Sequence, residues 1–449
     1  MSPLDRRDFV RTGATAALGA SLAPSRALGS WTRNGPADRL RLGFIGVGGR
    51  GSWLMGLALR RTDCDVTAVC DINLEAADRA ATAAREAGRD EPALYTAGEE
   101  DWRNLLTRDD VDAVIVATPW LWHTPMAVAA MEAGKAVGVE VPAATTVEDC
   151  WELVHTHERT GVPCMMLENV CYRRDVMAVL RMVREGLFGE LVHCQCGYQH
   201  DLRAVKFNPG AEFGPGASGE AVWRTQHSIT RNGELYPTHG IGPVGNWLGI
   251  NRGNRFLHLT STATKARGLH EYVVAVGGED HPNADVRFKL GDVVTTVITT
   301  ANGESIVVCH DTNLPRPYSL NFRVQGTRGL WMADHRSFYL EDSSPEPHRW
   351  EPFETYQAQF EHPLWTRFSG DAEGAGHGGM DFFVMHAFVE SVKRGEATPL
   401  DVYDAAAWSV IGPLSEQSIA MGNHPVAFPD FTGGRWAKRK PLFALGSVY

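Results

Sequence analysis

Three closely spaced glycines are the residues of this chain whose chemistry is easiest to identify. Gly46, Gly48 and Gly51 stand at the end of a short apolar run made by Leu42, Phe44, Ile45 and Val47, and they precede a helical pattern at residues 53–59. In such a setting the first glycine permits a tight turn, the second lets the backbone approach a pyrophosphate, and the third allows close strand–helix packing. The free N–H groups at the start of the helix favour negative charge. The motif therefore predicts a dinucleotide-binding turn.

An acidic residue after the next predicted strand indicates which dinucleotide is bound. Residues 66–70 form a second apolar run, and Asp71 follows directly, 20 residues beyond Gly51. A carboxylate at this distance accepts hydrogen bonds from the adenosine ribose and repels a 2′-phosphate. A glycine turn with a purely structural role is the alternative. The combination of strand, glycines and acid favours a bound NAD rather than NADP.

The elements that must position these residues alternate between strands and helices from residue 40 onward, which is typical of a parallel sheet. We expect further strands at 111–117, 136–140 and 164–167, and helices at 75–87, 102–106, 125–133 and 147–160. Ligands of such sheets lie beyond the carboxyl ends of the strands. Asp71 and the stretches 118–123 and 140–142 all follow predicted strands, so we expect them to share one site.

The second half of the chain has a different pattern. Residues 191–200 alternate like a strand of an open-faced sheet, and more strands are expected at 256–264, 293–300, 305–311, 320–325 and 330–332. Helices are expected at 175–185, at 402–422 and from 377 to 393. The stretches 201–255 and 333–370 show little periodicity and are expected to be loops. Long irregular stretches in compact domains are usually functional.

These patterns predict an α/β protein with two folded domains. The first is a Rossmann NAD-binding domain at 39–167, and the second is a substrate-binding α+β domain at 168–435 with an open, mostly antiparallel sheet. One face of that sheet would lie over helices, and the other would be free for a ligand or for another subunit of a homo-oligomer. Residues 436–449 are expected to form a C-terminal tail.

The N-terminal region is expected to stand outside the fold. Arg6 and Arg7 belong to a twin-arginine pattern, an apolar run of small residues follows at 12–23, and residues 25–27 suit a cleavage site. We expect a signal peptide at 1–27 and a linker at 28–38, with export of the folded, NAD-loaded protein by the twin-arginine translocase to the periplasm or the exterior. A disordered basic tail is the alternative. No stretch is long and apolar enough for an ordinary membrane-spanning helix.

Charge and cysteine content exclude some other functions. The net charge of −11 argues against a nucleic-acid-binding surface, which needs a basic stripe. The eight cysteines show no CxxC spacing and are expected to be buried free thiols. Cys194 and Cys196 share a strand face near His193 and His200, which leaves a metal site as the less favoured alternative to strand packing. We therefore expect no metal.

Longer stretches of the chain resemble known families. The glycine turn, Thr-Pro-x-x-x-His at 118–123, Glu-x-Pro at 140–142 and the antiparallel second domain resemble the Gfo/Idh/MocA oxidoreductases. A closer resemblance, to glycoside hydrolase family 109, the NAD-dependent α-N-acetylgalactosaminidases, is carried by residues 117–123, 166–175, 197–203, 231–240, 316–318, 377–382 and 401–408. This likeness covers nearly all of residues 40–435 and includes the twin-arginine leader.

The resemblance implies a set of functional positions in addition to the glycines. NAD would be contacted by Arg50, Gly51, Asp71, Trp120, Leu121, Trp122, His123, Glu140, Val141 and Asn169. A glycoside substrate would be contacted by Tyr198, Arg224, Tyr236, Pro237, Thr238, His239 and Tyr318. The expected reaction is hydrolysis of α-linked N-acetylgalactosamine or a related sugar through oxidation at C3, elimination, water addition and re-reduction.

One departure from the broader oxidoreductases bears on the chemistry. Those enzymes carry Glu-Lys-Pro with a catalytic lysine, whereas this chain has Val141 between Glu140 and Pro142. We expect the proton-transfer role to move to His239 and Tyr236 in one predicted loop. An imidazole can titrate near neutral pH, and a phenol can act if its neighbours depress its pKa. A hydrogen-bonded loop network without catalytic function is the alternative for this pair.

Structural roles stay open for several other residues. Trp120 and Trp122 would be core aromatics, His123 would cap the following helix, and Tyr198 would lie on a sheet face. His377 and Asp381 have no chemistry assigned from the sequence beyond helix capping and packing. At the level of the whole protein, the alternatives to the glycosidase are an NAD-dependent sugar dehydrogenase and a protein that carries NAD structurally.

Overall fold

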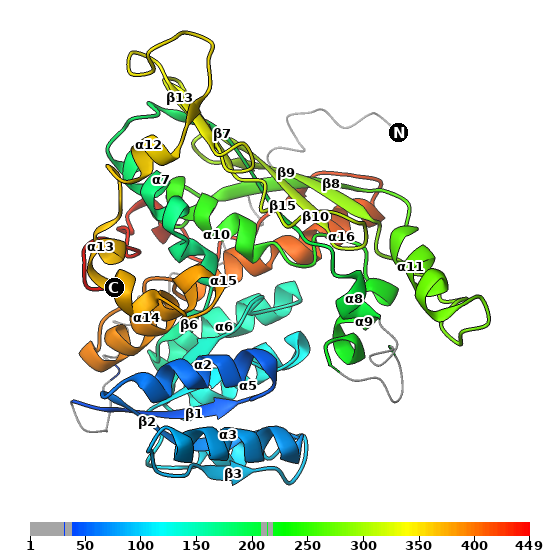
Figure 1. Cartoon of the computed structure of the whole chain (residues 1–449), viewed down its shortest axis with the longest axis vertical. Coiled ribbons are helices and arrows are strands. Elements are labelled where there is room, and N and C mark those ends of the chain that lie inside the picture. Colours follow the sequence, from blue (N-terminus) through cyan, green and yellow to red (C-terminus); the bar gives the residue numbers. More distant parts are fainter. Residues whose placement is uncertain (1–30, 32–37, 208–212, 214–218) are drawn as a thin grey trace, which may run out of the picture. The chain divides into compact units, whose positions relative to one another are not determined.

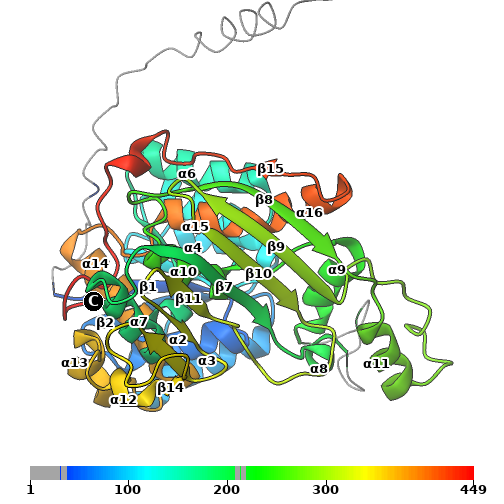
Figure 2. The same ribbon diagram turned by 90° about the horizontal axis from the view of Figure 1, so that it is seen from above.

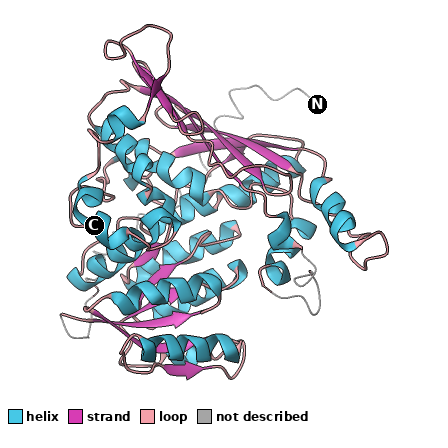
Figure 3. Cartoon of the chain, in the orientation of Figure 1, coloured by secondary structure: helices cyan, strands magenta, loops and turns pink. Residues whose placement is uncertain are grey.

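Two β-sheets organise the chain in the computed structural model (Figure 1, Figure 3). The structure describes residues 31, 38–207, 213 and 219–449. The signal peptide expected at 1–27 and most of the linker expected at 28–38 lie outside the described residues. A parallel sheet comes first and a mixed sheet follows, which confirms the predicted combination of a Rossmann domain with a second α+β domain.

The first sheet has six strands in the order β3-β2-β1-β4-β5-β6, all of them parallel. The strands are β1 (Leu40–Ile45), β2 (Cys64–Cys70), β3 (Ala93–Tyr95), β4 (Ala113–Val116), β5 (Ala136–Val139) and β6 (Cys164–Met166). Their connecting helices are α2 (Gly49–Arg60), α3 (Leu74–Glu86), α4 (Trp102–Leu106), α5 (His123–Glu132) and α6 (Val147–Thr160). Every residue of β4 and β5 is buried, because helices cover both faces of this sheet. The strand order reverses between β1 and β4, which is where such sheets bind dinucleotides.

The second sheet has nine strands in the order β14-β13-β12-β11-β7-β10-β9-β8-β15. Only β7 and β10 pair in parallel, so the sheet is mostly antiparallel, as predicted. The strands are β7 (Leu191–Gln199), β8 (Phe256–Ala263), β9 (Val293–Thr300), β10 (Ser305–Asp311), β11 (Arg323–Gly326), β12 (Gly329–Met332), β13 (Ser337–Leu340), β14 (Glu351–Pro352) and β15 (Val426–Ala427).

Helices cover one face of this second sheet. Helix α10 (Thr238–Trp247) contacts β7, and helix α16 (Ile411–Ala420) contacts β8. Figure 2 shows strands β7 to β10 in front, with α15 (Val402–Ser409) and α10 behind them. Val192, Leu257 and Val297 on the strands are exposed apolar side chains. Assembly of a homo-oligomer through this sheet stays a prediction.

Two stretches expected to be loops contain regular structure instead. Residues 201–255 include α8 (Arg203–Lys206), α9 (Ala221–Thr230) and α10. Helix α10 carries Pro243 and several glycines, which disfavour a helix in isolation. Its glycines allow close packing, since a Cβ at Gly240 would lie 2.7 Å from the backbone nitrogen of Gly197 in β7. Tertiary contact therefore decides the conformation of this segment.

Other expected boundaries also need correction. Residues 333–370 hold β13, β14, α12 (Glu354–Gln357) and α13 (Pro363–Ala372), and α11 (Gly268–Gly277) was not expected. The single helix expected at 402–422 is divided into α15 and α16. Pro413 explains the division, because its ring clashes with the carbonyl four residues earlier and it lacks an N–H for the helix. Helix α7 (Arg174–Arg184) and helix α14 (Met380–Arg394) lie where helices were predicted.

All eight cysteines lie in the described part of the chain and are free thiols. Cys194 and Cys196 are fully buried in β7, and burial raises the pKa of both thiols. His193 lies 2.8 Å from Ser305 Oγ rather than turning toward these cysteines. Among the described residues, no three His, Cys, Asp or Glu side chains are grouped as a metal site, and no helix has the length and apolarity to cross a bilayer.

Candidate active site

The glycine turn fits a bound pyrophosphate. Gly46 has a φ of +84°, and a Cβ there would lie 2.8 Å from the carbonyl oxygen of Ala117. A Cβ on Gly51 would lie 1.8 Å from the carbonyl oxygen of Gly46, so only glycine allows α2 to start this close to β1. Gly48 is the N-cap of α2, offers no side-chain cap, and has open space where its Cβ would point. An anion can occupy that space against the positive end of the helix.

Asp71 leaves β2 beside this turn. Its Oδ2 accepts the N–H of Val47 at 2.8 Å, and its Oδ1 accepts the N–H of Asn73 at 2.8 Å. An ionised carboxylate has about four acceptor positions. The remaining two are available to the two hydroxyls of an adenosine ribose, which agrees with the choice of NAD predicted from the sequence.

We expect Asp71→Ala to weaken NAD binding by about 10- to 100-fold, because hydrogen bonds to a charged group contribute about 1.5–3 kcal/mol. The NAD content of the purified protein and a fluorescence titration with NADH measure the change. Asp65→Ala is the matched control, since Asp65 lies on β2, the strand that Asp71 follows, but pairs with Arg39. Purification of the wild-type protein with NADP instead of NAD would show that the role given to Asp71 is wrong.

A buried carboxylate, Asp381, contacts two of the residues predicted to bind NAD, Arg50 and Asn169, and is linked to a third, Glu140, through Arg50. Arg50 of α2 bonds Glu140, which follows β5, at 2.7 Å and pairs with Asp381 of α14 at 2.9 Å. Asp381 has no exposed surface and also accepts hydrogen bonds from Asn169 at 2.7 Å and from His377 at 2.8 Å. The first turn of α14 is thereby tied to the carboxyl ends of two strands of the first sheet.

These contacts control the charge of the cluster. Burial by itself would raise the pKa of Asp381, but the hydrogen bonds from His377, Arg50 and Asn169 and the charge of Arg50 outweigh it and hold the pKa well below its usual range. The hydrogen bond to Asp381 raises the pKa of His377. Asp381 is thus a fixed negative charge, a role that the sequence analysis did not assign to it.

The residues after β4 differ in burial and in their contacts. Trp120 is buried, Leu121 is 65% exposed, and Trp122 is partly buried at the end of the short 3-10 helix η1 (Trp120–Trp122). His123 is buried and does not cap α5, because its ring nitrogens lie 2.7 Å from the carbonyl oxygens of Pro142 and Thr118. Burial lowers the pKa of His123. This histidine therefore joins the loops that follow β4 and β5.

Aromatic rings gather at the carboxyl end of β7. The ring centroid of Tyr198 lies 4.7 Å from that of Tyr236, 5.5 Å from that of His239 and 6.3 Å from that of Tyr318. The ring of Trp120 stacks on Tyr236 at 5.3 Å. The residues predicted to bind sugar are thus brought together with one residue predicted to bind NAD.

A cation covers this aromatic group. The guanidinium of Arg224 lies 4.9 Å from the Trp120 ring and 5.4 Å from the Tyr236 ring, and it pairs with Glu220 at 2.6 Å. Trp223 also contacts it, at 4.9 Å, and was not among the predicted residues. Aromatic walls with a few fixed polar groups are typical of small-molecule sites. Pro237 and Thr238, which were also predicted to bind the sugar, are buried.

His239 has a partner that the sequence analysis missed. Its Nδ1 lies 2.7 Å from Oε1 of Glu168, whose side chain is fully buried and also accepts the N–H of Val170 at 3.0 Å. Donation from Nδ1 to the carboxylate leaves Nε2 with the free lone pair of a base. Glu168 lies two residues after the end of β6, so an acidic residue at a strand end was the signal for it.

The structure changes two expectations about the catalytic pair. Tyr236 and His239 do not share one loop as expected. His239 lies in the first turn of α10, whereas Tyr236 lies before the start of this helix. Burial raises the pKa of Tyr236 well above its usual value although Arg224 acts to lower it. The depressed pKa on which a basic role for Tyr236 depended is therefore absent. Its phenol can donate a hydrogen bond at neutral pH.

Comparisons with known proteins agree with this geometry. Residues 40–168 match the family model of oxidoreductases with an NAD-binding Rossmann fold, and residues 172–438 match the model of the glycosyl hydrolase 109 C-terminal domain. The chain is 53% identical to a glycosyl hydrolase family 109 protein of Stenotrophomonas maltophilia, with 100% of both chains covered. It is 50% identical to an alpha-N-acetylgalactosaminidase of Tannerella forsythia, covering 98% of this chain and 99% of the relative.

Solved structures share the fold at lower identity. Levoglucosan dehydrogenase in complex with NADH and levoglucosan matches with a TM-score of 0.66 and 21% identity, over 87% of this chain and 100% of that chain. The myo-inositol dehydrogenase of Lactobacillus casei, in complex with NAD(H) and myo-inositol, matches with a TM-score of 0.59 and 17% identity, over 89% and 100%. The resemblance found in the sequence is confirmed: the chain belongs to glycosyl hydrolase family 109 and is an NAD-dependent glycoside hydrolase.

Proposed function

We propose that this enzyme hydrolyses α-linked N-acetylgalactosamine, or a closely related sugar, by oxidation at C3 followed by elimination and water addition. The name of the Tannerella forsythia relative supports the substrate. The observation that carries the mechanism is the 2.7 Å contact between His239 and the buried Glu168, within the aromatic group predicted to bind sugar. Most glycosidases use two carboxylates across the bond, and NAD-dependent enzymes are an exception.

The residues present fit NAD at the edge of the first sheet. The glycine turn would hold the pyrophosphate, Asp71 the adenosine ribose, and the cluster of Arg50, Glu140 and Asn169 would lie nearby. When bound there, NAD supplies a hydride acceptor for sugar C3 early in the reaction and a hydride donor at its end. Val141 is buried where the broader oxidoreductases have a catalytic lysine, so proton transfer needs another group.

His239 is the group that we assign to proton transfer at C2. With C3 at the ketone level, the C2–H bond is acidic, because the electron pair left on C2 is delocalised onto the C3 oxygen. Nε2 of His239 takes this proton, and Glu168 stabilises the imidazolium through Nδ1–H. The electron pair then forms the C1–C2 double bond as the bond from C1 to the aglycone oxygen breaks. Water then adds its hydroxyl group at C1, its other proton goes to the aglycone oxyanion, and His239 returns its proton to C2. Return of the hydride to C3 restores the sugar and completes the hydrolysis.

The aromatic group and its cation assist the charged stages. Tyr236 keeps its proton because burial raises its pKa, so it can donate a hydrogen bond to a substrate oxygen. The fixed charge of Arg224 beside Tyr236 favours negative charge that develops on the sugar. Tyr198, Tyr318 and Trp120 provide the walls that position the ring.

Hydrolysis in heavy water tests this mechanism. We expect the released sugar to carry deuterium at C2, because the proton on Nε2 of His239 exchanges with solvent before it returns. A deuterium label placed at C3 of the substrate should remain in the product, and no net NADH should accumulate. A product that retains its original C2 hydrogen throughout turnover would contradict the mechanism, and stoichiometric NADH release would indicate a sugar dehydrogenase instead.

A further inference from the structure

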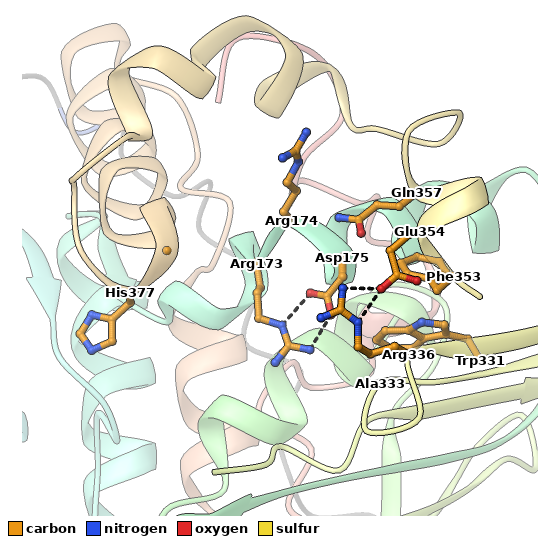
Figure 4. A pocket seen from close by; sticks show the side chains of 11 residues that line it. Arg173, Arg174, Asp175, Trp331, Ala333, Arg336, Phe353, Glu354, Gln357 and His377 are labelled. Carbon is orange, nitrogen blue, oxygen red and sulfur yellow. Dashed lines mark hydrogen bonds and ion pairs between the residues drawn. The ribbon is translucent and has the colours of Figure 1, made fainter. Parts of the chain in front are cut away.

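A cavity of about 430 Å³ lies beside the Asp381 cluster (Figure 4). Its lining comes from the start of α7, from strand β12 and the turn after it, from α12 and the residue that precedes it, and from the short 3-10 helix η3 (His377–Gly379). In Figure 4, Arg173, Arg174 and Asp175 lie between His377 on one side and Arg336, Glu354 and Trp331 on the other. None of the proposed catalytic steps uses this cavity.

The charges of the lining favour an anion. Arg173 pairs with Asp175 at 2.6 Å, Arg336 pairs with Glu354, and Arg174 pairs with Glu361, which is not one of the lining residues. Each of the three guanidinium groups is thus paired with a carboxylate, and because Glu361 is not a lining residue, the lining itself carries one excess positive charge. Arg173 is also the N-cap of α7 and has no side-chain cap, so the positive end of an 11-residue helix adds to the field.

The inner wall of the cavity is apolar and aromatic. Trp331 and Phe353 are almost fully buried, and Ala333 lies between them along the chain. Among the described residues, the indole N–H of Trp331 has no hydrogen-bond partner. A ligand that fits this lining has a flat or apolar body and a negatively charged end that reaches the guanidinium groups.

Two contacts connect the cavity with the active site. His377 lines the cavity and donates a hydrogen bond from Nδ1 to Asp381, which also holds Arg50 and Asn169. Ser319, the residue after Tyr318, donates its hydroxyl to Asp334 at 2.7 Å, and Asp334 is the neighbour of the lining residue Ala333. The guanidinium of Arg173 lies 5.1 Å from the ring of Phe322, which belongs to the same segment as Tyr318. A substrate with its sugar at Tyr318 can therefore extend past Arg173 into the cavity.

The backbone at the cavity is also unusual. Arg336 and His377 have φ values of 47° and 45°, in the left-handed region that residues other than glycine rarely adopt. Such conformations persist where the surrounding structure fixes them, and they cluster at ligand sites. Both residues belong to the cavity lining.

We propose that this cavity is the subsite for the aglycone and that it selects aglycones that carry a carboxylate next to an apolar body. A carboxylate matches the planar geometry of a guanidinium group, which can form two parallel hydrogen bonds to it. The inference rests on the proposed function, because an aglycone exists only if the substrate is a glycoside.

A matched pair of substrates tests the proposal. The 4-carboxyphenyl and 4-carbamoylphenyl α-N-acetylgalactosaminides have nearly the same shape, and only the first carries a charge. The ratio of their kcat/KM values is measured in the wild type and in variants, so that differences between the leaving groups cancel. We expect Arg336→Gln and Arg174→Gln each to lower the ratio about two- to fivefold, the range for exposed ion pairs, and the double variant to lower it further. Added salt should lower the wild-type ratio as well.

The controls separate the failure of this inference from the failure of the proposed function. Arg79→Gln removes an exposed arginine of α3 that is 68% exposed and should leave the ratio unchanged. Hydrolysis of both substrates with an unchanged ratio in the double variant would overturn the aglycone subsite. Should neither substrate be hydrolysed, the proposed function fails. Calorimetric titration with 4-hydroxybenzoate then tests the cavity alone, and equal binding to the wild type and the double variant would overturn the anion selectivity.

Discussion

Replacement of His239 by alanine is expected to lower kcat/KM for an α-N-acetylgalactosaminide by about 10²–10⁴-fold, the usual effect of removing a general base. NAD should stay bound, because His239 pairs with Glu168 and packs against Tyr198 and Tyr236, apart from the glycine turn. Steady-state kinetics together with the NAD content of the purified variant measure the two effects. Deuterium incorporation at C2 should be lost along with turnover.

Companion variants identify the origin of that loss. Glu168→Gln keeps the shape of the partner but removes its charge, so it should lower kcat and change the pH profile more than KM. Tyr236→Phe should cause a smaller loss, since it removes one hydrogen-bond donor. His258→Ala is the control, because His258 lies on β8 and contacts Thr299. Near-normal turnover in both His239→Ala and Tyr236→Phe would return this pair to a structural role.

The first sheet could be predicted because its signals are local. Strands β1, β2, β4 and β5 are short apolar runs, and each is followed by a turn or helix pattern within a few residues. Gly46, Gly48 and Gly51 have the spacing that the turn between β1 and α2 needs. Only the very short strand β3 escaped, because three half-buried residues give too little pattern.

The helical layer of the second domain was harder to predict because long-range packing decides it. Cβ atoms at Gly242 and Gly245 of α10 would lie 2.9 Å from Cys171 Sγ and from Trp408 Nε1, respectively. The glycines that lower the helix propensity of this segment are therefore needed for its contacts. A pattern of residues three or four apart does not contain this information.

The candidate site shows the same division. Positions at strand ends, such as Asp71 and Glu140, follow from local pattern, whereas the partners of Glu168 and Asp381 do not. His239 is 71 residues from Glu168, and Asn169 is 212 residues from Asp381. One sequence shows that these acids exist, but only the fold shows which side chains they hold.

The second large effect is expected at Asp381. Asp381→Ala should lower the free energy of unfolding by about 3–5 kcal/mol, because removal of one partner leaves other buried charged or polar groups unpaired. Arg50, Asn169 and His377 all lose a hydrogen-bond or ion-pair partner, and α14 loses its tie to the strand ends of the first sheet. Urea unfolding with and without NAD measures the loss. Asp78→Asn on the exposed side of α3 is the control.

The pH dependence of Asp381→Asn separates a charge effect from a packing effect. The lowered pKa of Asp381 means that its carboxylate stabilises the native state above the unfolded value of about 3.9 and loses this effect as the pH falls toward the native pKa. The raised pKa of His377 has the opposite sign: protonation stabilises the native state below about 6.5, and this stabilisation is lost as the pH rises through the native pKa.

The stability deficit of Asp381→Asn should therefore grow from pH 8 to pH 5 and shrink below about pH 4. In a His377→Gln background the growth between pH 8 and pH 5 should disappear. A deficit that does not change with pH would assign Asp381 to packing rather than to charge.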